Sequence, residues 1–275
     1  MRLQRCQAGL EASVTTAPQL GSRGKLATAL TLTMVGGFVD AVGYIALFEV
    51  FTANMSGNSV HVGMDLGQRN WLELLRPLCA IVSYVVGVAL TRITVEVAGR
   101  RGIRRIASFT LAMEVILLGL FARATPAMHL GQIVDLRSPA YFTLVALLAF
   151  AMGVQTATLT HVGALTIYTT FVTGTLTKLT ESLTRALFWG YDQLRQSGMS
   201  HFVGLACRQR DVREGVMLAS TWSCYVIGAA IGTVSKQRWE LRALYIPVVV
   251  LILFIVVDQV RPIGEEEERH QTGRG

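Results

Sequence analysis

The chain has 275 residues, of which 52% are hydrophobic and only 16% are charged. A soluble domain carries about 25% charged residues, so this chain lacks the polar surface that a water-soluble protein of its length needs. The net charge of +7 does not indicate a nucleic-acid partner, because the Arg and Lys residues gather between apolar runs, as is typical of membrane orientation signals.

The chain begins with a basic tail, residues 1–25, that has no apolar core followed by a small-residue cleavage site. We therefore expect a disordered cytosolic tail rather than a cleaved signal peptide. Six stretches then follow that are apolar and close to the length of about 20 residues that a membrane-spanning helix needs. They are Leu26–Val50, Leu78–Ala98, Ile106–Ala122, Ala140–Val162, Val212–Val234 and Ala243–Val260. Residues 263–275 form a polar C-terminal tail.

Two segments of the chain resemble one another. The first is G-F-V-D-A from Gly37, followed by F-T-A-N-M-S-G-N from Phe51. The second is G-V-Q-T-A from Gly153, 116 residues later, followed by Y-T-T-F-V-T-G-T from Tyr168. This recurrence predicts a duplicated three-helix unit, a common plan for membrane carriers.

The predicted units are residues 26–125 and 126–262. Three spans are an odd number, so the second unit is expected to be inverted relative to the first; a further span in each half would make the repeats parallel instead. Met55–Gly67 and Val172–Gly190 follow the two motifs and are short or polar for a crossing. We predict re-entrant or interfacial segments there. The fold class is thus an all-α integral membrane protein with six transmembrane helices in two inverted three-helix repeats.

Basic residues predict the orientation. Most of the 25 Arg and Lys residues lie in the two tails and in the second and fourth loops, including the short G-R-R-G-I-R-R loop from Gly99 to Arg105. By the positive-inside rule, both termini are expected in the cytosol.

Two carboxylates lie near the middle of predicted spans, Asp40 in the first and Glu114 in the third. An acid at the centre of a bilayer costs about 2.5–3.5 kcal/mol on insertion scales, so each is expected to face a partner or a polar cavity. Both are candidate proton- or cation-coupling groups. The alternative is a structural carboxyl that is protonated or hydrogen-bonded to a neighbouring helix.

The polar residues of the two motifs are candidates for lining a solute or ion pathway. Broken helices that carry hydroxyl and amide side chains commonly bind ions and small polar solutes, although close packing of small residues is the alternative interpretation. The candidates are Asn54, Ser56, Gly57 and Asn58 in the first half, and Gln155, Thr170, Thr173, Gly174 and Thr175 in the second.

No P-loop, HExxH, GxSxG or His/Cys cluster at metal spacing is present in the sequence, so we expect neither an enzyme nor a cofactor or metal. The two motifs resemble the paired signatures of the YoaK-like membrane proteins from about Lys25 to Ile263. That family commonly has Thr at the position of Ser56, and Asn at the position of Thr156. The resemblance implies a multi-pass membrane protein and adds no substrate.

The sequence favours a secondary transporter of a small solute in a plasma membrane, with Asp40 and Glu114 as the candidates for proton coupling. Its expected partners are the lipid bilayer and the solute, and a homo-oligomer is possible. A non-transporting subunit or scaffold is the first alternative, and an enzyme that acts on a lipid-soluble substrate is the second.

Overall fold

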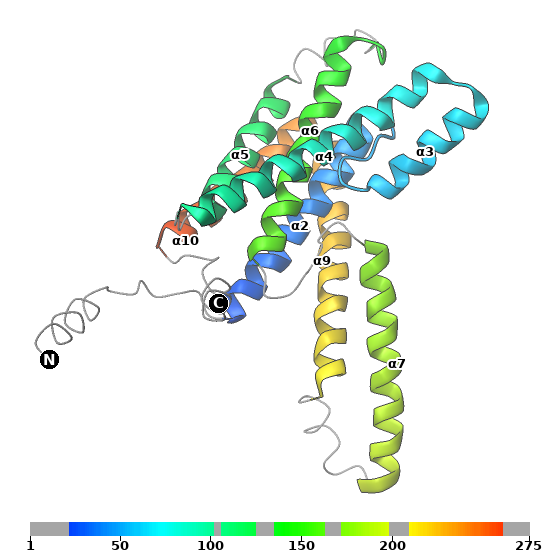
Figure 1. Ribbon diagram of the computed structural model, residues 1–275, viewed down its shortest axis with the longest axis vertical. Helices are drawn as coiled ribbons and strands as arrows, with labels where there is room; N and C mark the ends of the chain where they lie inside the picture. The colour runs from blue at the N-terminus through cyan, green and yellow to red at the C-terminus, as the bar shows by residue number, and fades with distance from the viewer. Residues whose placement is uncertain (1–21, 102–105, 125–134, 163–171, 198–208, 261–275) are drawn as a thin grey trace, which may run out of the picture.

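The computed structural model describes residues 22–101, 106–124, 135–162, 172–197 and 209–260, and within them it contains helices and no strand (Figure 1). The elements in chain order are α2 (Ser22–Ala46), α3 (Met55–Gln68), α4 (Trp71–Arg100), α5 (Ile106–Ala124), α6 (Pro139–Val162), α7 (Val172–Ser197), α9 (Arg210–Trp239), the 3₁₀ helix η2 (Glu240–Leu244) and α10 (Tyr245–Val260). The all-helical prediction is confirmed for this part of the chain. Four residues of the predicted N-terminal tail, 22–25, belong to α2, and the rest of both tails lies outside the described residues.

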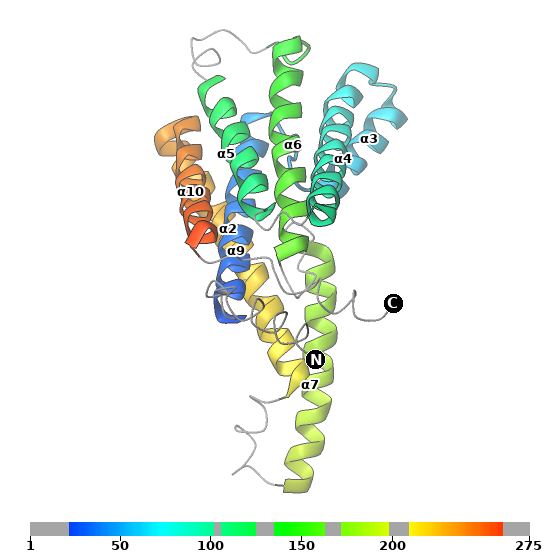
Figure 2. The same ribbon diagram turned by 60° about the vertical axis from the view of Figure 1, so that its left-hand side comes forward.

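Five helical stretches are long and apolar enough to cross a membrane. The fifth stretch, Arg210–Val260, includes α9, η2 and α10 without interruption, so it contains both the fifth and the sixth predicted windows. The chain nevertheless turns at η2, where Glu240 has a positive φ of 50°, and α10 then runs back along the bundle (Figure 2). Because α10 has only 16 residues, a separate sixth span stays a prediction.

Helices α2 and α9 form a close parallel pair held by glycines. A Cβ atom on Gly37 would lie 2.1 Å from the carbonyl oxygen of Tyr225, and one on Gly228 would lie 2.0 Å from that of Met34. A real side chain cannot occupy either place, so only glycine allows the two backbones to touch. Small residues at such crossings are how membrane helices gain van der Waals contact without a hydrophobic driving force.

Helices α4 and α6 form a second parallel pair in the same manner. A Cβ atom on Gly153 would lie 2.3 Å from the carbonyl oxygen of Tyr84, and one on Gly87 would lie 2.5 Å from that of Phe150. The contacts of the two pairs correspond one to one. Gly153 takes the place of Gly37, and Phe150 takes the place of Met34, each 116 residues later in the chain. Each pair therefore joins the first helix of one half of the chain to a later helix of the other half.

The two pairs meet along a seam between α2 and α6, which run antiparallel. A Cβ atom on Gly43 would lie 2.9 Å from Leu148, and one on Gly36 would lie 3.2 Å from the side-chain oxygen of Gln155. This seam is much smaller than the contact within either pair. Helix α5 packs on α6 and on α10, and α7 packs on the first turns of α9 (Figures 1 and 2).

We expect Gly228→Ala to destabilise the protein, because the new methyl group must push the α2 backbone away. Overpacking of this kind costs about 1–3 kcal/mol in free energy of unfolding. Thermal unfolding in detergent micelles measures the effect. The control is Gly119→Ala on α5, where a Cβ meets nothing within 4 Å. Equal stability of the two variants would contradict the close contact.

Candidate functional site

The first motif builds a turn that folds back into the bundle. The first window was predicted to continue to Val50, but α2 ends at Ala46, because Phe48 and Glu49 take up positive φ values of 52° and 69°. Such values are costly for residues other than glycine and need support from their surroundings. The turn returns past about six residues of α2, or about 9 Å of helix, to reach Asp40.

Asp40 holds this turn with one carboxylate oxygen. Its Oδ1 accepts hydrogen bonds from the backbone N–H of Thr52 at 3.0 Å, from the hydroxyl of Thr52 at 3.0 Å, and from the N–H of Ala53 at 2.8 Å. Its Oδ2 accepts a bond from the Tyr225 hydroxyl of α9 at 2.7 Å. Asp40 is only 5% exposed, and both of its carboxylate oxygens are hydrogen-bonded. These bonds offset the cost of burying an acid in the middle of a helix.

The other polar residues of the first motif complete the turn and begin α3. The side chain of Asn58, which is fully buried, donates to the carbonyl of Phe51 at 2.7 Å and accepts from its N–H at 3.0 Å. Asn54 caps α3, since its side-chain oxygen accepts from the N–H of Gly57 at 3.3 Å and from the hydroxyl of Ser56 at 2.7 Å. These predicted pathway residues therefore hold the local fold.

Gly57 is required by the same turn. A Cβ at this position would lie 2.8 Å from the ring of Phe51. In the second half, Thr173, Gly174 and Thr175 lie in the first turn of α7, where Thr173 is exposed and the other two are half-buried. Thr170 lies outside the described residues.

Two predicted site residues are buried without a hydrogen-bond partner among the described residues. Glu114 on α5 is 0% exposed, and neither of its carboxyl oxygens is bonded. Gln155 on α6 is also 0% exposed, and both its side-chain oxygen and its nitrogen are unbonded. Buried polar groups are nearly always paired, so each exception calls for an explanation such as a ligand or a second conformation.

Gln155 is at a particular place in the fold. It lies against Gly36, on the seam where the α2/α9 pair meets the α4/α6 pair. Thr91 on α4 is the third buried residue whose side-chain oxygen is unbonded within the described residues. In the same part of the chain, no three His, Cys, Asp or Glu residues are grouped as metal ligands would be.

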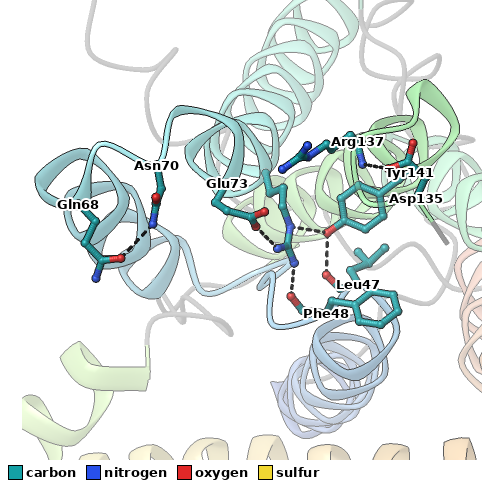
Figure 3. Close-up of polar contacts among 9 residues, drawn as sticks. Leu47, Phe48, Gln68, Asn70, Glu73, Asp135, Arg137 and Tyr141 are labelled. Carbon is teal, nitrogen blue, oxygen red and sulfur yellow. Dashed lines mark hydrogen bonds and ion pairs between the residues drawn. The ribbon is translucent and has the colours of Figure 1, made fainter. Parts of the chain in front are cut away.

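A second cluster, absent from the sequence analysis, joins the end of α2 to the beginnings of α4 and α6 (Figure 3). Arg76 of α4 donates to Glu73, to the carbonyl of Phe48, and at 3.2 Å to the hydroxyl of Tyr141 on α6. The Tyr141 hydroxyl in turn donates to the carbonyl of Leu47 at 2.8 Å. These bonds satisfy the carbonyl groups of Leu47 and Phe48, the first two residues after α2.

The sequence analysis also missed Tyr225, although a signal for it exists. Y-V-V-G-V-A from Tyr84 and Y-V-I-G-A-A from Tyr225 form another recurrent pair, 141 residues apart. These two stretches carry the glycines and carbonyls of the two helix crossings.

The fold and site define a multi-pass helical membrane protein, with apolar spanning helices around buried polar side chains. Residues 28–257 match the family described as "Protein of unknown function (DUF1275)", and because this covers most of the chain, the chain belongs to that family. It is also 26% identical over 240 residues, 86% of this chain and 94% of the other, to the UPF0700 transmembrane protein YoaK of Bacillus subtilis (strain 168). The resemblance to YoaK-like proteins is thereby confirmed. No solved structure matches the chain.

We expect Asp40→Ala to release the turn, because the buried N–H groups of Thr52 and Ala53 lose their acceptor. Each unpaired buried group costs about 1–3 kcal/mol. Asp40→Asn keeps one acceptor oxygen and is expected to have a smaller effect. Hydrogen exchange at the two amides measures this, with Asp65→Ala, outside the turn, as the control. Unchanged exchange in Asp40→Ala would exclude the carboxylate as the holder of the turn.

Proposed function

We propose that this protein is a secondary transporter of a small polar solute and not an enzyme. The observation that carries the proposal is the buried, unbonded side chain of Gln155 at the seam between two tightly packed helix pairs. A carboxamide offers two N–H donors and one acceptor. In a carrier, a passing solute bonds to such a group in one state of the cycle, and the group is shut away in another.

The proposed architecture is six spans in two inverted repeats. The matched glycine contacts support it: Gly37 and Gly153 meet backbone atoms at Tyr225 and Tyr84, which occupy equivalent places in the two halves. Such repeats place the solute site at their interface, which is where Gln155 lies. We propose further that the protein resides in the cell membrane with both termini in the cytosol.

Glu114 is the group that we assign to proton coupling. Its carboxyl is fully buried and bonded to nothing in the described part of the chain, so a charge on it would have no partner to offset the cost of burial, and we propose that it carries a proton there. It can release the proton when the bundle opens to water. Asp40, whose oxygens are occupied by three backbone or hydroxyl donors of the turn and by Tyr225, serves to hold the turn.

A non-transporting membrane subunit or scaffold is the second candidate. The observation that favours it is that the most distinctive polar residues, Asp40, Asn54 and Asn58, use their hydrogen bonds within the fold.

Labelling distinguishes the two candidates. In a cysteine-free background, Gln155→Cys is treated with a membrane-impermeant thiol reagent from each side of sealed vesicles. A carrier is expected to react from both sides, because the seam opens alternately, and exposed Ser59→Cys on α3 serves as the positive control. Absence of reaction from either side contradicts transport along the seam and favours the scaffold.

For Glu114→Gln we expect loss of solute-driven proton movement, because the amide cannot release a proton. The measurement uses proteoliposomes with an internal pH-sensitive dye, to which amino acids, sugars, nucleosides, organic acids and polyamines are added in turn. The matched control is Glu96→Gln, which changes an exposed acid paired with Arg100 at 2.8 Å. Proton movement in Glu114→Gln equal to that of the parent protein excludes Glu114 as the coupling group.

A further inference from the structure

We propose that the cluster around Arg76 is a latch that closes one end of the seam between the two helix pairs. The latch consists of Arg76 and Glu73 on α4, Tyr141 on α6, and the carbonyl groups of Leu47 and Phe48 at the end of α2. This inference rests on the proposed transport function, for which it names the gate at one membrane face.

The first step of the argument is that the cluster crosses the boundary between the pairs. Arg76 and Tyr141 belong to the α4/α6 pair, whereas Leu47 and Phe48 directly follow α2, the helix that packs on α9. Within each pair, the two backbones touch at glycines over an extensive contact. Between the pairs, the α2–α6 seam is small, so a relative movement of the pairs must break the two bonds of the cluster that cross it, from Arg76 to Phe48 and from Tyr141 to Leu47.

The second step concerns where the cluster sits along the seam. Tyr141 and Leu47 are joined at one end of the seam, Gly43 and Leu148 touch further in, and Gly36 and Gln155 lie deeper still. The bonds of Arg76 and Tyr141 therefore close the approach from that end to the buried amide of Gln155.

The third step is the chemistry of the bonds. Arg76 uses a different nitrogen of its planar guanidinium for each of Tyr141, Glu73 and the carbonyl of Phe48, whereas a lysine has a single nitrogen to place among the three. Its side chain is only 15% exposed, its guanidinium carbon lies 5.6 Å from the centre of the Tyr141 ring, and Tyr141 is fully buried. The bond between Arg76 and Tyr141 is therefore largely buried, whereas the partners Glu73 and Phe48 lie at the water-accessible edge of the latch.

The fourth step is an asymmetry between the two halves. If the repeat is extended to this region, the position that corresponds to Arg76, 141 residues later, is Met217, and a methionine side chain has no N–H or O–H to donate. The same latch cannot form at the opposite end, so the two faces of the proposed carrier are held shut differently. Helix packing is also unequal, since α5 packs extensively on α6 whereas α10 barely touches α2.

The test measures the distance between the pairs directly. Spin labels are placed in a cysteine-free background at two exposed positions, Gln237 at the end of α9 and Leu72 at the start of α4. Pulsed electron paramagnetic resonance then gives the distance distribution in lipid nanodiscs. We expect one main distance in the parent protein, and a second, longer one in Arg76→Gln. The ratio of long to short distances is expected to rise about tenfold, the factor to which the loss of one charged hydrogen bond corresponds.

Two variants keep the test decisive. Tyr141→Phe removes only the hydroxyl, which donates to Leu47 and accepts from Arg76. It is expected to shift the same distribution in the same direction, even if Arg76→Gln does not fold. Arg100→Gln, which removes an exposed ion pair within α4, should leave it unchanged. An unaltered distribution in both Tyr141→Phe and Arg76→Gln overturns the latch. The distance measurement tests the latch alone, because it does not measure solute flux. If the latch opens as expected but the protein carries no solute, the latch stands and only the transport proposal is refuted.

Discussion

The architecture depends on two places where helix backbones touch through glycine. Gly37 and Gly228 bring α2 against α9, and Gly87 and Gly153 bring α4 against α6. In a bilayer, helices gain nothing from hiding apolar side chains from lipid, so close backbone approach is what selects these partners over others. Each contact joins the two halves of the chain, and the seam, the turn and the latch are all arranged around the two resulting pairs.

Given these pairs, the buried polar residues divide into two groups. The residues of the first motif bond to each other and to the backbone, so they fix the turn after α2 and connect it through Tyr225 to α9. Glu114 and Gln155 have no such bonds in the described part of the chain. The first group makes a rigid frame, and the second is available for a solute or a proton. The function that we propose follows from the second group.

Much of the fold could be predicted from the sequence. Long apolar windows indicate helices whatever their partners, and the matched motifs contain Gly37 and Gly153, which make the close backbone contacts of α2 and α6. The end of α2 could not be predicted, because neither Phe48 nor Glu49 is a residue type that favours the positive φ values found there. The turn is instead held by the long-range bonds of Asp40, Arg76 and Tyr141.

The candidate site was predicted less well, for a physical reason. Asn54 and Asn58 have the residue types that a solute pathway would use, and sequence cannot tell an amide that bonds a ligand from one that bonds the backbone of Phe51. Arg76 and Tyr141 are far apart in sequence and belong to no motif, so only the packing of α4 on α6 brings them together. Glu114 and Gln155 were predicted as site residues, and their burial without partners keeps them as candidates.

The most direct test of the central claim, that each half of the chain is completed by the other, is to divide the protein between α5 and α6. Residues 1–130 and 131–275 are produced separately and together, and their association is measured by co-purification and thermal unfolding in detergent. The account predicts that the two fragments bind one another and unfold together near the temperature of the intact chain, while each alone is unstable. A fragment that alone forms a stable, folded monomer would contradict it.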